Sequence, residues 1–308
     1  MSLPTVFVCG ATGTQGGAVA RHLRAKGAEV HALVRDPSSP KAKAIESLGV
    51  KTWHGDFDNE DALKKAIAGC SAVFLNFMPD FTDLSANLRQ AKSILSIAKD
   101  AGVKHVVYTS GFGPGVAEKS PSWDPEGIIA LILASKKDIE AETRASGLKY
   151  WTILRPGNFM ANYIDPFVRM YDGLVEKGTW FTALSEETVL PMVDTETIGA
   201  FSTAALLDPE RFHEKEISYA DEMITLGYIL KKLSEVTGRE LRAVTLSEDE
   251  IQEQSKTNKS ITAQLVMRHM SDLVDIDEVK KWGIPLSTFD AFVEREKARV
   301  LATYVKSS

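Results

Sequence analysis

The chain has 308 residues, of which 44% are hydrophobic and 25% charged, a composition typical of a globular protein with a full core. The net charge of −6 and the lack of a basic stripe argue against direct binding to nucleic acid, because phosphate contacts require clustered lysine and arginine. No apolar run reaches the roughly 18 residues of a membrane-spanning helix, and no signal peptide precedes the first strand, so we expect a cytoplasmic protein without a membrane partner.

The cysteines and histidines give no sign of a disulfide or a metal site. Cys9 and Cys70 each lie in or beside a predicted apolar strand, so we expect both to be buried as small hydrophobic residues in a reducing compartment. The six histidines are scattered without the spacing of metal ligands, and we predict no metal.

The first element is an apolar strand that runs directly into glycines at positions 10, 13 and 16 and then into an amphipathic helix. Gly10 permits a tight turn, Gly13 lets the backbone approach a pyrophosphate, and Gly16 allows the helix to pack on the strand. The helix then directs its unpaired N–H groups at the phosphates. This order of strand, glycine turn and helix predicts a dinucleotide site.

The second strand, residues 30–34, ends at Arg35 and Asp36. The residue at this strand end meets the adenosine ribose in dinucleotide-binding folds, where an acid suits NAD and an arginine suits the 2′-phosphate of NADP. Arg35 occupies this position and Asp36 comes one residue after it, so we favour Arg35 as a ligand of NADP(H). The alternative is that Arg35 is a solvated charge at the start of a loop.

Strands and helices alternate through the first half of the chain. Further strands are predicted at 50–55, 71–76, 103–109 and 149–154, and helices at 42–48, 59–68 (with Asn59 as N-cap), 83–101 and 125–146. This alternation predicts right-handed βαβ units, and therefore an α/β fold with a doubly wound parallel sheet of the Rossmann type in residues 1–155.

The second half, residues 156–308, is predicted to be a smaller, helix-rich α/β substrate lobe that packs against the sheet. Helices are expected at 158–177, 195–207, 225–237, 247–255, 260–273 and 287–304, and short strands at 187–192 and 216–219. No internal repeat or long linker interrupts it.

Several short motifs follow one another over about two-thirds of the chain. They are residues 10–16 (GATGTQG), 33–36 (LVRD), 55–57 (GDF), 135–140 (SKKDIE), 154–160 (LRPGNFM) and 191–194 (PMVD). In this order they resemble the NmrA-like group of atypical short-chain dehydrogenases/reductases. The resemblance implies a Rossmann fold that binds NADP(H) at the strand ends.

The resemblance also implies a role for individual residues. The phosphates would be contacted by Gly10, Thr12, Gly13, Thr14, Gln15 and Gly16. Asp56 and Phe57 would lie beside the adenine, and Asn76 and Phe77 beside the pyrophosphate and ribose. The nicotinamide end would be met by Thr109, Ser110, Lys136, Pro156, Asn158 and Phe159. From the residues alone, Lys136 could equally be a surface lysine.

One departure from this group concerns the chemistry. Catalytic short-chain dehydrogenases carry a tyrosine four residues before the lysine, and this tyrosine acts as general acid and base. Here that position is Ile132, which cannot transfer a proton. Ser110 without that tyrosine is a poor acid at neutral pH. Lys136, or Tyr163, could supply the proton instead, although packing is the simpler role for Tyr163.

The residues around the expected nicotinamide pocket are mostly apolar, namely Trp123, Ile128, Ile129, Leu131, Leu133 and Met160. They suit a flat hydrophobic substrate, or they simply pack in a core.

Three functions remain open. The first, which we favour, is an NADPH-dependent oxidoreductase for a small conjugated electrophile such as a quinone or enone.

The second function is a non-catalytic NADP(H)-binding sensor or transcriptional regulator, which would act through a protein partner and be nuclear or cytoplasmic. The third is a redox-neutral tailoring enzyme. In each case the sequence is compatible with a monomer or a homodimer.

Overall fold

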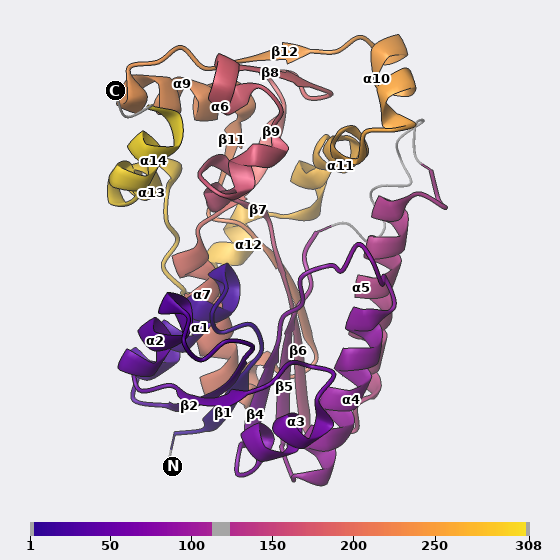
Figure 1. The fold of residues 1–308 in the computed structure, drawn as a ribbon, viewed down its shortest axis with the longest axis vertical. Helices are drawn as coiled ribbons and strands as arrows, with labels where there is room; N and C mark the ends of the chain where they lie inside the picture. The colour runs from indigo at the N-terminus through magenta and orange to yellow at the C-terminus, as the bar shows by residue number, and fades with distance from the viewer. Residues whose placement is uncertain (1–2, 113–123, 306–308) are drawn as a thin grey trace. The chain divides into compact units, whose positions relative to one another are not determined.

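The computed structural model describes residues 3–112 and 124–305, and the chain divides into two compact units (Figure 1). The first unit comprises Met1–Gly111, Ala134–Arg155 and Thr195–Ile217. The second comprises Phe112–Leu133, Pro156–Asp194 and Ser218–Ser308. The predicted division into a cofactor domain and a substrate lobe at residue 155 stays a prediction about function. By compactness, residues 195–217 belong with the first unit.

The first unit is built on a seven-stranded sheet with the order β10-β6-β5-β4-β1-β2-β3. The strands are β1 (Thr5–Val8), β2 (Glu29–Val34), β3 (Lys51–His54), β4 (Ala72–Leu75), β5 (His105–Thr109), β6 (Tyr150–Pro156) and β10 (Lys215–Tyr219). Neighbouring strands from β3 to β6 pair in parallel, and the order reverses between β1 and β4. The predicted doubly wound α/β fold is confirmed. Such a reversal is where ligands bind in open α/β sheets.

Helices cover both faces of this sheet (Figure 1). They are α1 (Thr14–Ala25), α2 (Pro40–Ser47), α3 (Glu60–Ile67), α4 (Ala86–Asp100), α5 (Ile128–Ala145), α7 (Thr195–Leu207) and the short α8 (Pro209–Phe212). The side chain of Asn59 accepts a hydrogen bond from Ala62 N at 3.0 Å, so the predicted N-cap of α3 is confirmed.

The core of the first unit lies between the sheet and helices α3 to α5. It contains Cys9 and Cys70, both free thiols, so their predicted burial is confirmed. Burial disfavours the thiolate and raises the pKa of each thiol to about 12. Neither thiol is therefore a nucleophile at neutral pH.

The second unit holds two small sheets and most of the remaining helices. The strands are β7 (Asn158–Phe159), β9 (Val189–Val193) and β11 (Glu222–Thr225) in one sheet, and β8 (Thr179–Thr182) and β12 (Arg242–Thr245) in the other. The helices are α6 (Leu174–Lys177), α9 (Leu226–Thr237), α10 (Glu248–Ser255), α11 (Lys259–Met267), α12 (Ile276–Lys280), α13 (Phe289–Arg295) and α14 (Lys297–Tyr304). The predicted helix-rich α/β character of this region is confirmed.

Two segments of this unit that were each predicted as one helix are divided into several elements. Residues 158–177 form strand β7, 3₁₀ turns at Met160–Tyr163 and Phe167–Met170, and only then α6. Pro166 lacks the N–H that a helix needs and Gly173 disfavours one, which explains the interruption. Residues 287–304 divide at Glu296 into α13 and α14. Strands β8, β11 and β12 were not predicted, since each has four residues and little alternation.

Among the residues that the structure describes, no helix has the length and apolar character needed to cross a bilayer.

Candidate functional site

The glycine turn between β1 and α1 has the geometry that the motif predicts. Gly10 adopts φ +66°, a conformation that other residues rarely take, and its carbonyl oxygen accepts a hydrogen bond from Gly13 N at 2.8 Å. A Cβ on Gly16 would lie 2.3 Å from the Gly10 carbonyl oxygen and 2.6 Å from that of Cys9. Only glycine at position 16 lets the helix begin this close to the strand.

Helix α1 begins at this turn with no side chain capping it. Gly13 is the N-cap and makes no side-chain cap hydrogen bond. The first turn of a helix has N–H groups without intrahelical partners and carries the positive end of the helix dipole. Thr14, Gln15 and Gly16 therefore present donors that fit a phosphate group.

Gln15 ties this turn to the ends of the two neighbouring strands. Its Nε2 donates to Asn76 Oδ1 at 3.2 Å, and its Oε1 accepts from Thr109 Oγ1 at 3.0 Å. One orientation of the amide satisfies both bonds. The structure thus brings three sequence-predicted residues, from α1 and from the ends of β4 and β5, into one hydrogen-bonded chain at the carboxyl edge of the sheet.

Arg35 and Asp36, at the end of β2, differ in their hydrogen bonds. Asp36 Oδ1 accepts hydrogen bonds from Ser38 Oγ at 2.6 Å and Ser38 N at 2.8 Å, which lower the pKa of this carboxyl group. Arg35 is exposed and forms no ion pair or hydrogen bond within the described residues. The carboxylate is occupied by its own loop, whereas the guanidinium is available to an anion.

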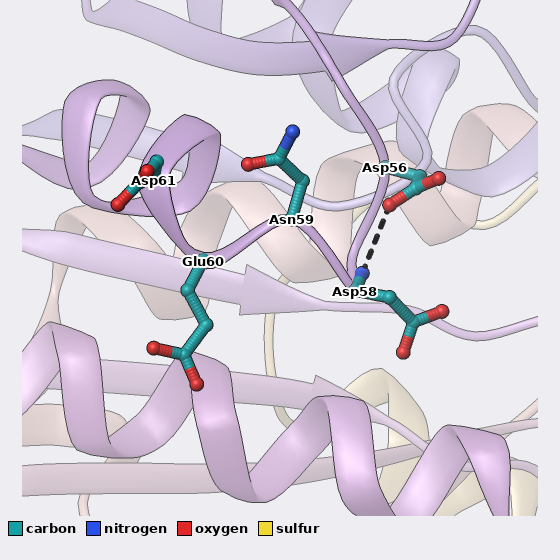
Figure 2. A pocket seen from close by; sticks show the side chains of 5 residues that line it. All are labelled: Asp56, Asp58, Asn59, Glu60 and Asp61. Atoms are coloured by element: carbon teal, nitrogen blue, oxygen red, sulfur yellow. Dashed lines mark hydrogen bonds between the residues drawn. The ribbon is translucent and has the colours of Figure 1, made fainter.

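A shallow surface hollow follows β3 at the N-terminus of α3 (Figure 2). It is lined by Asp56, Asp58, Asn59, Glu60 and Asp61. Asp56 Oδ1 accepts a hydrogen bond from Asp58 N at 3.1 Å, which is the dashed line in Figure 2. Four carboxylates repel a phosphate, so this hollow is unsuited to binding one.

Two predicted aromatic residues lie side by side at the same strand ends. The rings of Phe57 and Phe77 meet edge to face with centroids 5.9 Å apart, and Phe77 lies 6.5 Å from the ring of Tyr108 on β5. Both phenylalanines are half-buried, so each has ring surface left to pack against another group.

Lys136, on α5, reaches the end of β5. Its Nζ donates to the carbonyl oxygen of Ser110. Gly111 makes room for it, because a Cβ there would lie 3.1 Å from Nζ, and its φ of +125° disfavours any side chain. Burial lowers the pKa of Lys136 to about 8, an effect that the negative charge of Glu140 opposes. This lysine is partly buried and not a surface residue.

The Ser110 hydroxyl is buried beside this lysine and makes no hydrogen bond of normal geometry within the described residues. Ile132 precedes Lys136 by one helical turn and carries no group that transfers protons. Lys136 and Ser110 therefore stand at this end of β5 together with Thr109, whose hydroxyl is bound to Gln15.

The other predicted site residues belong to the second unit. Asn158 Oδ1 accepts a hydrogen bond from Asn162 Nδ2 at 3.1 Å, and its Nδ2 lies 3.4 Å from Met192 Sδ. Pro156 is buried and Phe159 half-buried. Met160 lies in the core of this unit, and Trp123 falls outside the described residues.

Tyr163 is fully buried, with its ring 5.2 Å from Tyr171 and 6.2 Å from Phe289 between ring centroids. Burial raises the pKa of its phenol well above the ordinary value. A phenol without access to solvent is a poor proton donor, so its surroundings favour the packing role.

Two ionic clusters were not predicted, although they involve motif residues. In the first unit, Glu140 pairs with Arg155 and Arg144. In the second, buried Asp194 receives two hydrogen bonds from Arg295, at 2.7 and 2.8 Å. The motifs contained Glu140, Arg155 and Asp194, but their partners lie up to 101 residues away along the chain. The pair of Glu140 and Arg144 has the i,i+4 spacing of a helix, but no local pattern reveals the pairs of Glu140 with Arg155 and of Asp194 with Arg295.

Within residues 3–112 and 124–305, no group of three or more His, Cys, Asp or Glu side chains is arranged to hold a metal ion. The sequence-based expectation of no metal stays a prediction.

Comparison with known proteins places the chain in a family. Residues 3–291 match the profile of the NmrA-like family. The chain belongs to the NmrA-like family. The family match covers both units and includes all six motifs, so the resemblance drawn from the sequence is confirmed.

Among similar proteins, an NAD(P)H azoreductase of Xenophilus azovorans is 30% identical, over 79% of this chain and 77% of its own. A structure of Citrobacter sp. triphenylmethane reductase complexed with NADP(H) has a TM-score of 0.71 at 24% identity, covering 94% of this chain and 99% of that one. NmrA, a negative transcriptional regulator, in complex with NADP has a TM-score of 0.72 at 18% identity, covering 97% and 95%. The two structures confirm the fold.

Proposed function

We propose that this NmrA-like protein is an NADPH-dependent reductase that acts on a small, hydrophobic, conjugated electrophile. The observation that carries the proposal is the carboxyl edge of the seven-stranded sheet. At this edge the glycine turn and the start of α1 follow β1, and the guanidinium of Arg35 follows β2. The amine of Lys136, from α5, reaches the end of β5 at the same edge. A nicotinamide dinucleotide needs donors in this order.

The residues of the first unit fit NADPH from one end to the other. The 2′-phosphate would be bound by Arg35, the adenine bordered by Asp56 and Phe57, and the pyrophosphate bound by the turn from Gly10 to Gly16, including Thr12 and Thr14, with Asn76 and Phe77 beside it. The nicotinamide end would meet Thr109, Ser110 and Lys136.

Replacing Arg35 with alanine is expected to weaken NADPH binding about tenfold to a hundredfold while changing NADH binding less than about threefold, because only NADPH carries the 2′-phosphate. Binding is measured by titrating the purified variant with each cofactor and following cofactor fluorescence. The matched control is Arg21→Ala, since Arg21 lies on α1 and pairs with Glu196. Equal losses for both cofactors would remove Arg35 from the phosphate site.

Bound NADPH would supply a hydride, and reduction of a quinone to a hydroquinone also consumes one proton from the protein or solvent. We propose Lys136 as the source of that proton. Its ammonium lies against the end of β5, and its lowered pKa keeps the amine close to half-protonated near pH 8. After giving up a proton at Nζ, the neutral amine would recover one from water.

The rate of NADPH oxidation is accordingly expected to fall as the pH rises through about 8, because the ammonium is the acid and its deprotonated fraction grows above its pKa. Lys136→Arg should retain a low rate that does not change over this range, because a guanidinium stays charged. Lys136→Ala should fold, bind NADPH more weakly and lose about 100-fold in rate. A wild-type rate that stays level up to pH 10 would exclude Lys136 as the proton donor.

The reaction is tested by following the absorbance of NADPH with the purified protein and a panel of quinones, enones, azo compounds and triphenylmethane dyes. The similarity to an azoreductase and to a triphenylmethane reductase supports flat aromatic electrophiles as the first compounds to try. Oxidation that depends on the substrate and disappears in Lys136→Ala is the expected result.

A second function is favoured by one feature, the isoleucine at position 132. A sensor needs NADP(H) but no proton donor, and the structural neighbour NmrA is named a negative transcriptional regulator. If the protein binds NADPH but oxidises it with no compound of the panel, a regulator that acts through a protein partner replaces the reductase as our proposal. In such a regulator, the form with bound NADP(H) and the form without it must differ in their affinity for the protein partner.

A further inference from the structure

Four charged side chains of the first unit form an ionic cluster, namely Glu140, Arg144, Arg155 and Glu216. Glu140 on α5 is 2% exposed and accepts a hydrogen bond from Arg155 Nε at 2.8 Å and another from Arg144 at 3.0 Å. The carboxylate of Glu216 on β10 accepts one hydrogen bond from each of the same two arginines, both at 2.6 Å. Two carboxylates and two guanidiniums make this cluster electrically neutral.

Lys136 lies outside this cluster, one helical turn before Glu140 on the same helix. Side chains four residues apart on a helix lie on the same face. Within residues 3–112 and 124–305, the one hydrogen bond of the Lys136 amine goes to the carbonyl of Ser110, and no carboxylate of this part of the chain binds it directly. Glu140 is the charged group that acts on this amine, and it favours the ammonium.

The other titratable groups near this part of α5 do not take over that role. Tyr108 on β5 stays neutral, because burial raises its pKa and the charge of Glu140 raises it further. The cluster arginines would repel an ammonium, and Glu216 is 32% exposed at the outer side of the cluster. Glu142, on the same helix, pairs with Lys92 of α4 at 3.2 Å.

We propose that Glu140 is a positioning residue that keeps the Lys136 amine protonated at the end of β5. This inference rests on the proposed reductase, in which Lys136 supplies the proton. Arg144 and Arg155 hold the Glu140 carboxylate in place by hydrogen bonds at 3.0 and 2.8 Å, on the face of α5 that carries Lys136.

Glu140→Gln is expected to lower the pKa of Lys136 by about one unit, because the amide has the same shape but no charge that favours the ammonium. Glu216→Gln is the matched control. It removes one carboxylate from the same two arginines, yet this carboxylate does not act on Lys136. A structural loss of the cluster would affect both variants alike.

The pKa of Lys136 is measured directly by competitive labelling of the folded protein with acetic anhydride at a series of pH values, with the labelled peptide quantified by mass spectrometry. This reports on the amine without turnover, so it succeeds or fails separately from the proposed reductase. The expected result is a labelling midpoint shifted down by about one pH unit in Glu140→Gln and unchanged in Glu216→Gln. Equal midpoints in wild type and Glu140→Gln, or equal shifts in both variants, would overturn the proposal.

If Glu140→Gln does not fold, the double variant Glu140→Gln/Arg144→Gln restores the neutrality of the cluster and carries the same test. Its labelling midpoint should again lie below that of wild type, because the charge that favoured the ammonium is gone. A midpoint equal to that of wild type would overturn the role of Glu140. With an active substrate in hand, the fall in NADPH oxidation should begin about one pH unit lower in Glu140→Gln.

Discussion

Replacing Gly16 with alanine is expected to lower the free energy of unfolding by about 3 kcal/mol and to weaken NADPH binding at least about tenfold. The new Cβ would lie 2.3 Å from the Gly10 carbonyl oxygen and 2.6 Å from that of Cys9, distances that real Cβ atoms do not show. Both neighbours are backbone atoms, so α1 must move away from β1. The N–H groups that would bind the pyrophosphate move with it.

The matched control for this variant is Gly13→Ala. A Cβ at Gly13 would lie 3.2 Å from the Gly10 carbonyl oxygen, and its φ of −96° is open to any residue. We therefore expect Gly13→Ala to remain within about 1 kcal/mol of wild type in urea unfolding while still weakening NADPH binding, because its methyl group would stand where the phosphates approach. Full stability and full affinity in Gly16→Ala would contradict the close packing of turn and helix.

Replacing Arg295 with alanine is expected to cost about 3–5 kcal/mol of stability in the second unit. Asp194 has no exposed side-chain surface, and Arg295 binds both of its carboxylate oxygens. The carboxylate also accepts a hydrogen bond at 3.0 Å from the hydroxyl of Ser287, a group that carries no charge. Without the guanidinium, the buried carboxylate loses the counter-charge that offsets its desolvation.

This loss is measured by urea unfolding followed through tryptophan fluorescence, since Trp180 lies in the core of the second unit. Lys297→Ala is the control. Its amine pairs with Glu294 at 3.6 Å, and both side chains are more than half exposed, so it should change stability by less than about 0.5 kcal/mol. A comparable loss in both variants would show that the surface of α14, and not the buried ion pair, determines the result.

The local pattern of the sequence was enough to predict most elements of the first unit. The alternation of apolar strands and amphipathic helices predicted the parallel sheet, and the spacing of Gly10, Gly13 and Gly16 predicted the turn that starts α1. These signals are reliable because they depend on backbone conformation and on burial within one element. In the second unit the same approach failed over residues 158–177, where apolar spacing suggested a helix that Pro166 and Gly173 interrupt.

The tertiary structure decided what the functional side chains do. Lys136 is one of two adjacent lysines in the sequence, and only the fold brings its amine to the carbonyl of Ser110 and makes it partly buried. Likewise, Arg35 has no hydrogen bond or ion pair with the described residues, while Asp36 is bound by Ser38. Arg155 meets Glu140 and Glu216 across 15 and 61 residues of chain, so these two pairs have no local signature. The sequence by itself determined where a dinucleotide would bind. The charge, burial and partners of each site residue came from contacts between distant segments, because electrostatic interactions depend on distance in space.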